Sequence, residues 1–302
     1  MPPSSSHVAP ALLEVMKRNP VTVAPETALD QVLELLERYG FRHLPVVEAN
    51  RVVGMISDRD VYLATGLLGT EQRLRDERGR ELPGARLAGE IQRRPVHCLT
   101  QEATVLEAAR DMLRLRIGAI PVVERGGGDV LCGIVTETDL LRIALELCRS
   151  DESADAPARA RLRSPLPCVA PETSIEEALQ RLDPEIRHLG VLRGSSLVGI
   201  VSQRDLLFGL ARTAIREARA TAEPRCPEPP RRVEQVMSTR LVTAAPETPL
   251  SHCAGRMLDR RISALPVLEG ERPIGIVTRG DVLAHMVAAC TESAAPRGAE
   301  RP

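Results

Sequence analysis

Four stretches of the chain carry apolar residues at positions i, i+3, i+4 and i+7, the spacing of one face of an α-helix. They predict four amphipathic helices with the same register. Their apolar faces comprise Leu29, Val32, Leu33 and Leu36; Val105, Ala108, Ala109 and Met112; Ile175, Ala178, Leu179 and Leu182; and Leu250, Cys253, Ala254 and Met257. Start signals support three of these helices. The signals are Thr104 with Glu107 and Ser174 with Glu177, which form capping boxes, and Thr248, which precedes a proline at the first helical position.

Two short runs rich in branched apolar residues follow each predicted helix and predict a pair of strands. The first runs begin at His43, Ala119, His188 and Ala264. The second runs share one motif, in which glycine and two apolar residues precede Ser or Thr, two variable residues and aspartate. Its four copies are Gly54 to Asp60, Gly133 to Asp139, Gly199 to Asp205 and Gly275 to Asp281.

An extended stretch precedes each helix and a second apolar helix follows each aspartate, so the repeating unit is strand, helix, strand, strand, helix. The predicted repeats span residues 12–67, 87–149, 160–213 and 233–290, and residues 1–11 and 291–302 are expected to be flexible ends. A unit of about 50 residues is too small to bury a good core alone. We therefore expect an α+β protein whose repeats pair through their sheets and helices.

The repeats alternate in character, which indicates duplication of a two-repeat module. Copies one and three carry a basic pair before the middle strand and arginine before the aspartate; these residues are Arg42, His43 and Arg59, and Arg187, His188 and Arg204. Copies two and four have small residues before the middle strand. The polar residues 150–159 predict a linker between modules, and residues 69–89 and 221–232 predict the longer connections.

The composition excludes several classes of protein. The 302 residues include 40 basic and 41 acidic side chains and 1% aromatic residues, which argues against a nucleic-acid binder. No apolar run approaches the roughly 18 residues of a membrane span, and the start lacks a secretory signal, so we expect a cytoplasmic protein without membrane insertion. The seven cysteines include no C-x-x-C pair and the histidines are scattered, which argues against a metal site.

Because four copies agree in order, spacing and residue type, the chain resembles the CBS domain family, whose repeats pair into Bateman modules. The resemblance covers nearly all of the chain and implies four βαββα repeats in two tandem modules. In that family an adenosine derivative binds between paired repeats. The motif aspartate holds the ribose hydroxyls, and the hydroxyl residue of the motif lies near phosphate or ribose.

Carried over by position, the resemblance implies a set of nucleotide-binding residues. The ribose ligands are Asp60, Asp139, Asp205 and Asp281, with Ser57, Thr136, Ser202 and Thr278 beside them. The cationic candidates are Arg42, His43, Arg59, Arg187, His188 and Arg204. Thr22 and Thr243 occupy the family's place for a threonine near the base or ribose, whereas Cys98 and Cys168 do not.

Two of the four sites are expected to be better formed than the others. Copies one and four contain the threonines, so we expect them to bind best. In copy three Asp183-Pro184 shortens the first helix and Gly190 replaces a proline, so its pocket is expected to be distorted or empty.

The motif also has a purely structural interpretation, because Ser/Thr-x-x-Asp caps a helix without any ligand, and capping can coexist with binding.

The sequence contains no nucleophile, phosphate-loop or metal motif of an enzyme, and the loop Arg125 to Asp129 is predicted to be a turn between two strands. We therefore predict a regulatory protein without catalytic cofactor. It binds AMP, ADP or ATP and signals energy state to a partner protein. The alternatives are S-adenosylmethionine or NAD as ligand, a ligand-free scaffold, and a homodimer in place of a disk closed within one chain.

Overall fold

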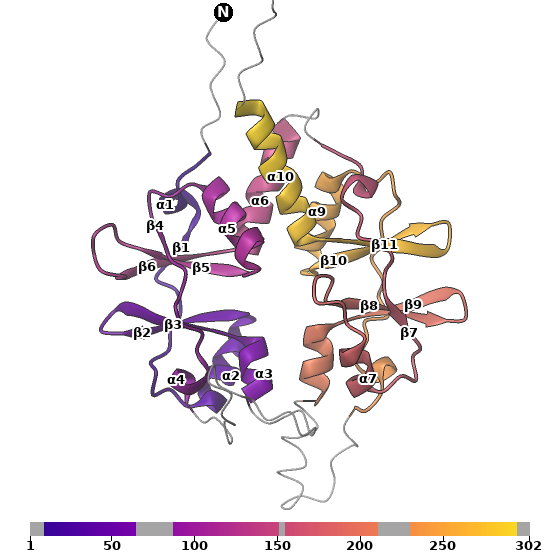
Figure 1. The fold of residues 1–302 in the computed structure, drawn as a ribbon, viewed down its shortest axis with the longest axis horizontal. Helices are drawn as coiled ribbons and strands as arrows, with labels where there is room; N and C mark the ends of the chain where they lie inside the picture. Colours follow the sequence, from indigo (N-terminus) through magenta and orange to yellow (C-terminus); the bar gives the residue numbers. More distant parts are fainter. Residues whose placement is uncertain (1–8, 65–86, 151–154, 211–229, 295–302) are drawn as a thin grey trace, which may run out of the picture.

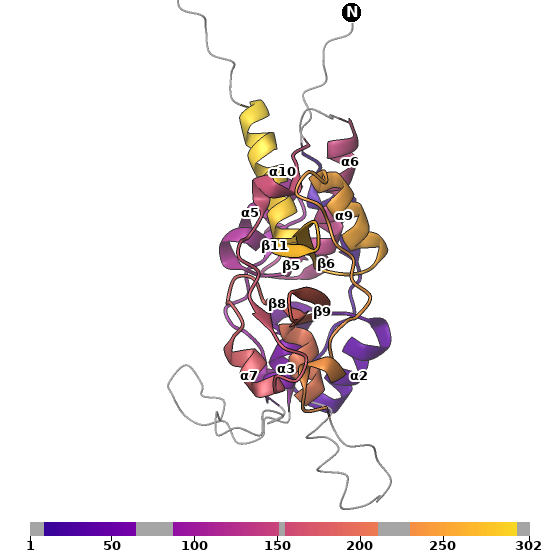
Figure 2. The same ribbon diagram turned by 90° about the vertical axis from the view of Figure 1, so that its right-hand side faces the viewer.

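The computed structural model describes residues 9–64, 87–150, 155–210 and 230–294, which contain the four repeats apart from residues 65–67 and 211–213. Face on, the repeats occupy the quarters of a flat body, with repeats one and two on the left and repeats three and four on the right (Figure 1). The same body is much narrower edge on (Figure 2). Repeats one and two are called the first module here, and repeats three and four the second. The predicted connections lie largely outside the described residues, as do residues 1–8 and 295–302 of the predicted flexible ends.

Each repeat contains the predicted helix, hairpin and second helix. Repeat one has α2 (Leu29–Tyr39), β2 (His43–Glu48), β3 (Arg51–Ser57) and α3 (Asp58–Ala64). Repeat two has α5 (Val105–Leu115), β5 (Ala119–Val123), β6 (Leu131–Thr136) and α6 (Glu137–Ser150). Repeat three has α7 (Ile175–Gln180), β8 (His188–Arg193), β9 (Ser196–Ser202) and a helix over residues 203–210. Repeat four has α9 (Leu250–Asp259), β10 (Ala264–Glu269), β11 (Arg272–Thr278) and α10 (Arg279–Ala294).

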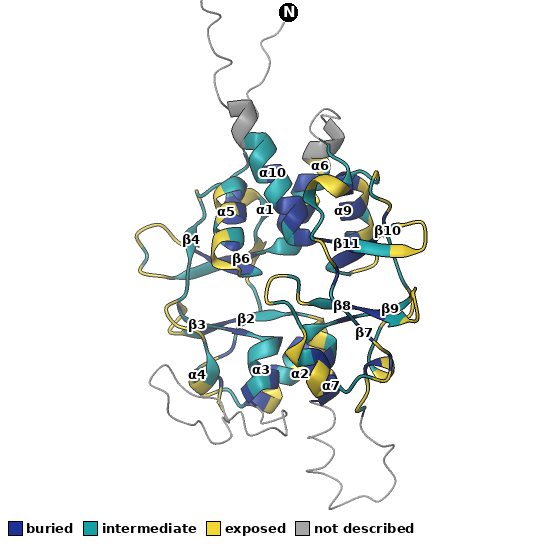
Figure 3. Cartoon of the chain, turned by 45° about the vertical axis from the view of Figure 1, so that its right-hand side comes forward, coloured by how far each residue is buried: buried dark blue, intermediate teal, exposed yellow. Residues whose placement is uncertain are grey.

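The first strand of each repeat is very short. It is a single bridge, Val23 to Val46, in repeat one and a single bridge, Ala244 to Val267, in repeat four. In repeats two and three it is β4 (Leu99–Thr100) and β7 (Cys168–Val169), each parallel to the middle strand. The hairpins that follow are antiparallel. Figure 3 shows exposed residues at the hairpin turns and on several helices, and buried residues on both the strands and the helices.

Some predicted boundaries were wrong by a few residues. Helix α7 ends at Gln180, so Leu182 lies beyond it; Asp183 instead accepts the backbone N–H groups of Glu185 and Ile186 and turns the chain. Pro249 is the N-cap of α9, with extended backbone, rather than its first helical residue. Helix α10 continues to Ala294, which makes residues 291–294 helical rather than a flexible end.

The capping boxes were half right. Thr104 and Glu107 form the full reciprocal pair, with bonds of 2.6 to 3.2 Å. Ser174 accepts the N–H of Glu177 at 3.1 Å, but the Glu177 carboxylate pairs with Arg181 at 2.6 Å instead of returning to the cap.

The segment at the start of each repeat packs into the other repeat of the same module. Four short turns carry this exchange: α1 (Leu12–Val15), α4 (Ala88–Ile91), η2 (Ala158–Arg161) and η3 (Val233–Gln235). Their fully buried residues Leu12, Ala88, Ala158 and Val233 belong to the cores of repeats two, one, four and three, respectively. Their backbone N–H groups donate at 2.8 to 2.9 Å to carbonyls of that partner repeat, those of Ala103, Thr27, Thr248 and Thr173. Neither repeat of a module therefore completes its core alone.

After each turn the chain crosses the motif strand of the partner repeat. These crossing segments are residues 17–22, 93–98, 163–168 and 238–243, and they meet Ile134, Met55, Ile276 and Ile200, respectively. The motif glycine permits the crossing. A Cβ on Gly275 would overlap the carbonyl oxygen of Arg163, and a Cβ on Gly133 would lie 2.5 Å from Sδ of Met16.

The two modules meet along the centre of the body. Repeats two and four share a core in which Leu283 and Met286 of α10 pack with Leu140 and Ala144 of α6. Repeats one and three meet through Tyr62 and Leu207. One chain thus closes into a four-repeat disk (Figure 1).

Gly275→Ala is expected to destabilise the protein, because the added methyl group meets a backbone carbonyl that cannot rotate away. The free energy of unfolding should fall by about 1 to 3 kcal/mol, the usual effect of overpacking. Gly255→Ala is the matched control, since Gly255 lies within α9 and its Cβ position has open space around it. Alanine there should raise stability by roughly 0.5 to 1 kcal/mol. Urea denaturation followed by circular dichroism measures both, and equal effects would contradict the close crossing.

Candidate functional site

Each motif aspartate closes a capped turn between its strand and the helix that follows. Its Oδ2 atom accepts the hydroxyl and the backbone N–H of the motif Ser or Thr, at 2.5 to 3.0 Å in all four repeats. The capping role is therefore present at Ser57, Thr136, Ser202 and Thr278. Because it uses only one carboxylate oxygen, the other oxygen, Oδ1, stays available for a second interaction.

In repeats one and four, Oδ1 binds an arginine from the crossing segment. Arg93 donates to Asp60 from Nε and Nη2 at 3.0 and 2.9 Å. Arg163 donates to Asp281 from Nε at 2.7 Å. The aspartate side chains are 10% and 8% exposed, so these ion pairs are partly shielded from water.

Repeats two and three differ from each other at the same atom. Oδ1 of Asp139 pairs with Arg142 at 3.2 Å and with Lys17 of the crossing segment at 3.6 Å. In repeat three Ser238 takes the place of the crossing cation. Oδ1 of Asp205 has no hydrogen bond or ion pair with another residue that the structure describes. Its Oδ2 accepts the backbone N–H and the hydroxyl of Ser202, as in the other repeats.

The two candidate threonines lie at the ends of crossing segments. Segment 17–22 meets repeat two at Lys17 and Arg18, and the chain returns to repeat one at Val23, next to Thr22. Segment 238–243 meets repeat three at Ser238, which exchanges backbone bonds of 2.9 and 3.0 Å with Ile200, and the chain returns to repeat four at Ala244, next to Thr243. Each threonine therefore lies where the chain passes from the partner repeat to its own, and this crossing leaves no local signal in the sequence.

Repeat three also keeps the geometry of the other repeats. Its hairpin pairs His188 with Ser202 as repeat one pairs His43 with Ser57. The turn at Asp183 shortens α7 without disturbing the hairpin or the capped aspartate.

The two candidate histidines are neutral at physiological pH rather than cationic. Burial, aided by the charge of Arg42, lowers the pKa of His43 to about 4. Burial also lowers the pKa of His188, whose ring contacts the Ile186 carbonyl at 2.7 Å and the Ser263 hydroxyl at 3.1 Å. His43 packs in the same way over Gly118. The histidines of the odd repeats thus pack against small residues of the even repeats.

The variable residues of the motif join the modules, a role that the sequence did not reveal. Arg204 pairs through Nε with the buried carboxylate of Asp58 at 2.6 Å, from repeat three to repeat one. Arg279 donates to the Thr138 hydroxyl at 2.8 Å, from repeat four to repeat two. Burial raises the pKa of Asp58 and of Glu137, which lies near Arg279. Arg204, a predicted ligand residue, is therefore already engaged.

Three other arginines at the module junction have guanidinium N–H groups without an acceptor among the described residues. Nε of Arg59 is buried and has no hydrogen-bond partner. The side chain of Arg42 makes no hydrogen bond with a described residue, and that of Arg187 makes one, to the Pro184 carbonyl at 3.3 Å. Burial lowers the pKa of Arg59, and the nearby charge of Arg187 lowers it further. An anion placed here would occupy the open donors and relieve the repulsion.

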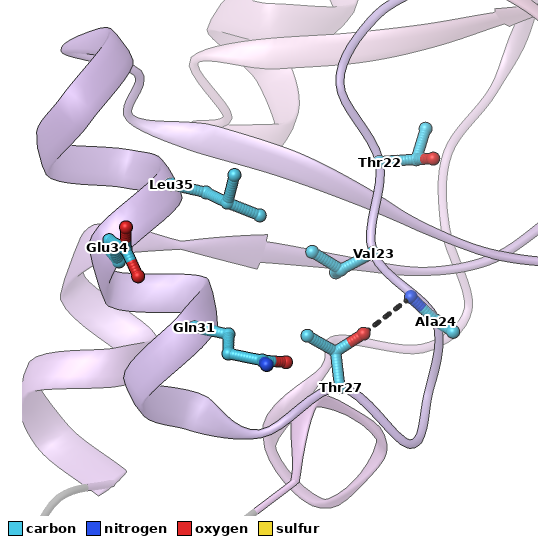
Figure 4. Close-up of a pocket in the computed structure, with 7 residues that line it drawn as sticks. All are labelled: Thr22, Val23, Ala24, Thr27, Gln31, Glu34 and Leu35. Atoms are coloured by element: carbon cyan, nitrogen blue, oxygen red, sulfur yellow. Dashed lines mark hydrogen bonds between the residues drawn. The ribbon is translucent and has the colours of Figure 1, made fainter.

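Two surface cavities lie away from these groups. One, of about 340 Å³, lies between α2 and the extended segment that carries Thr22 (Figure 4), and its lining includes Gln31 and Leu35 but no arginine. The other, of about 470 Å³, lies beside Val52 and Cys98. Neither includes a motif aspartate, so neither is the nucleotide site that the motif predicts.

The described residues include no group of three or more His, Cys, Asp or Glu side chains arranged to hold a metal ion. Burial raises the pKa of the Cys98 and Cys253 thiols to about 11, so both are protonated at neutral pH and poorly nucleophilic. Among the helices of the described ranges, none is both long and apolar enough to cross a membrane.

His43 is expected to make stability depend on pH. Its pKa is about 4 in the folded protein and about 6.5 when unfolded, so between these values only the unfolded chain takes up the proton. Stability should therefore fall as the pH is lowered from 6.5 towards 4, by roughly 1 to 2 kcal/mol between pH 7 and pH 5.

His43→Gln should remove this part of the loss, as measured by urea denaturation at pH 7 and pH 5. His252→Gln is the control, because His252 is exposed on α9. A wild-type pH dependence that His43→Gln leaves unchanged would show that the imidazole is not buried in the neutral form.

Comparison with known proteins shows the same fold elsewhere. Protein MJ1225 of Methanocaldococcus jannaschii is 28% identical over 279 residues, which span 88% of this chain and 94% of that protein. Its crystal structure, described as that of a candidate archaeal homolog of g-AMPK, matches 91% of this chain and 99% of its own with a TM-score of 0.72 and 24% identity. An uncharacterized conserved protein from Pyrococcus horikoshii has the same fold, with a TM-score of 0.60, 22% identity and coverage of 92% and 100%. A model of the CBS domain matches residues 12–65, 88–146, 159–212 and 233–288, more than half of the sequence, and the chain belongs to the CBS domain family.

Proposed function

We propose that this CBS protein binds an adenosine nucleotide, AMP, ADP or ATP, where a crossing segment meets a motif aspartate, and that it passes the occupancy of the site to a partner protein. The ribose hydroxyls bind Oδ1 of the aspartate, and the phosphates reach the arginines at the module junction. The observation that carries the proposal is the buried Nε of Arg59, which has no acceptor and lies close to a second guanidinium, that of Arg187.

Two neighbouring guanidinium groups with open donors favour a phosphorylated ligand. Each buried donor without an acceptor costs free energy, and charge repulsion adds to that cost. Phosphate oxygens accept several hydrogen bonds from arginine and carry the opposite charge. Because His43 and His188 are neutral at pH 7, the arginines supply the positive charge.

The ribose has a matching acceptor. A carboxylate can accept hydrogen bonds from two adjacent hydroxyl groups. The capped turn fixes its orientation through Oδ2, and in repeats one and four Oδ1 contacts the crossing segment. Capping and ligand binding therefore use different atoms of one side chain.

The regulatory part of the proposal rests on the contacts between modules. Asp58 and Arg204 join repeats one and three, and Arg279 and Thr138 join repeats two and four, all within two residues of a motif aspartate. A ligand that binds one arrangement of these residues more tightly shifts the equilibrium towards that arrangement. A partner protein that prefers the same arrangement then responds to the nucleotide, and the chain itself needs no catalytic group.

Isothermal titration of the full chain with AMP, ADP, ATP, S-adenosylmethionine and NAD tests the proposal. We expect saturable heat with at least one of AMP, ADP and ATP. Arg59→Gln should weaken their binding by about tenfold or more, since it removes charged donors from the phosphate. Arg272→Gln, an exposed arginine at the turn of the last hairpin, should have no effect.

Two results would contradict the proposal. S-adenosylmethionine has no phosphate, so its tight and Arg59-independent binding, without binding of AMP, ADP or ATP, would identify a different class of ligand. If none of the five compounds gives saturable heat with folded protein, the aspartates act only as helix caps, and a ligand-free scaffold is favoured.

A further inference from the structure

The four crossing segments place equivalent residues beside the four motif aspartates. Backbone bridges align Lys17 with Ile134, Arg93 with Met55, Arg163 with Ile276 and Ser238 with Ile200, and each second residue follows the motif glycine directly. Lys17, Arg93 and Arg163 therefore correspond to Ser238. Three of these four positions carry a cation and one does not.

The cations occupy the oxygen that a ribose needs. Arg93 makes two bonds to Oδ1 of Asp60, Arg163 makes one to Asp281, and Lys17 with Arg142 surrounds Oδ1 of Asp139. Hydroxyl groups that bind there must displace a guanidinium or ammonium group from a carboxylate that is at most 10% exposed. A neutral hydroxyl competes poorly with a charge-assisted hydrogen bond.

Repeat three is free of this competition. Oδ1 of Asp205 has no partner within the described part of the chain, and Ser238 is neutral and too short to cover it. The same crossing segment supplies Thr243, one of the two threonines that occupy the first-strand position. His188, which lies near Asp205, already binds Ile186 and Ser263.

We infer that Asp205 forms the open nucleotide site of this chain, and that Arg93, Arg163 and the pair Lys17 and Arg142 hold the other three sites closed. The inference rests on the proposed function and assigns it to one quarter of the disk. It also predicts a ligand with both ribose hydroxyls. The presence of a cation in the crossing segment, rather than the motif itself, decides which site binds.

Exchanging the residues between sites tests this assignment. In titrations with AMP, the wild-type chain should bind one equivalent. Ser238→Arg supplies the missing cation and should weaken binding by about tenfold or more, whereas Arg93→Ser should open the Asp60 site and add a second equivalent. Against the wild type, 2′-deoxy-AMP should bind more weakly than AMP by a similar factor, because one hydroxyl bond to the carboxylate is lost.

Ser196→Arg is the matched control, since Ser196 is exposed at the other end of β9. Thermal unfolding confirms that each variant is folded. Ser238→Arg introduces the same residue type that already occupies the equivalent crossing positions, Arg93 at repeat one and Arg163 at repeat four. If AMP binds the wild type with several equivalents, or if Ser238→Arg binds AMP as well as Ser196→Arg does, the assignment is wrong while nucleotide binding stands. If AMP does not bind the folded wild type at all, the AMP site itself is contradicted.

Discussion

The short turn at the start of each repeat completes the core of the other repeat in its module, and the geometry at the centre of the disk depends on this reciprocal exchange. Val233 is buried in repeat three although it begins repeat four, and Leu12 is buried in repeat two although it begins repeat one. From these anchors each crossing segment runs over the motif strand of the partner, where only glycine leaves enough room. The exchange thus makes each candidate site a joint product of two repeats, which is why occupancy can be coupled to their relative arrangement.

The motif combines three physical roles within four residues. Its Ser or Thr and the Oδ2 atom of its aspartate cap the turn, so the fold needs these groups even when no ligand is bound. Its variable residues form the contacts between modules, including the buried pair of Asp58 and Arg204. Only Oδ1 is left for a ligand, and the crossing segment controls access to it. A chain with four copies of the motif therefore does not need to have four equivalent sites.

Much of the fold could be predicted from the sequence because the signals are local and repeated four times. Helical spacing, branched strands and the capped motif each lie within one short stretch, and the turn at Arg125 to Asp129 follows from its glycines. The exchange could not be predicted, because nothing near Thr243 indicates that its segment crosses repeat three. The prediction that His43 and His188 are cationic was wrong for a similar reason. Burial between repeats lowers the pKa of both side chains, and burial is a property of the assembled fold. The partner of Arg204 lies in another module, beyond the reach of any local pattern.

A crystal structure of the full chain grown with AMP would show which site the nucleotide occupies. We expect ribose hydroxyls on Oδ1 of Asp205, beside Ser238, with the phosphate towards Arg59 and Arg187 and with Arg93 still bound to Asp60. AMP bound at Asp60 or Asp281 with the arginine displaced, or bound in the cavity beside Thr22, would contradict this expectation.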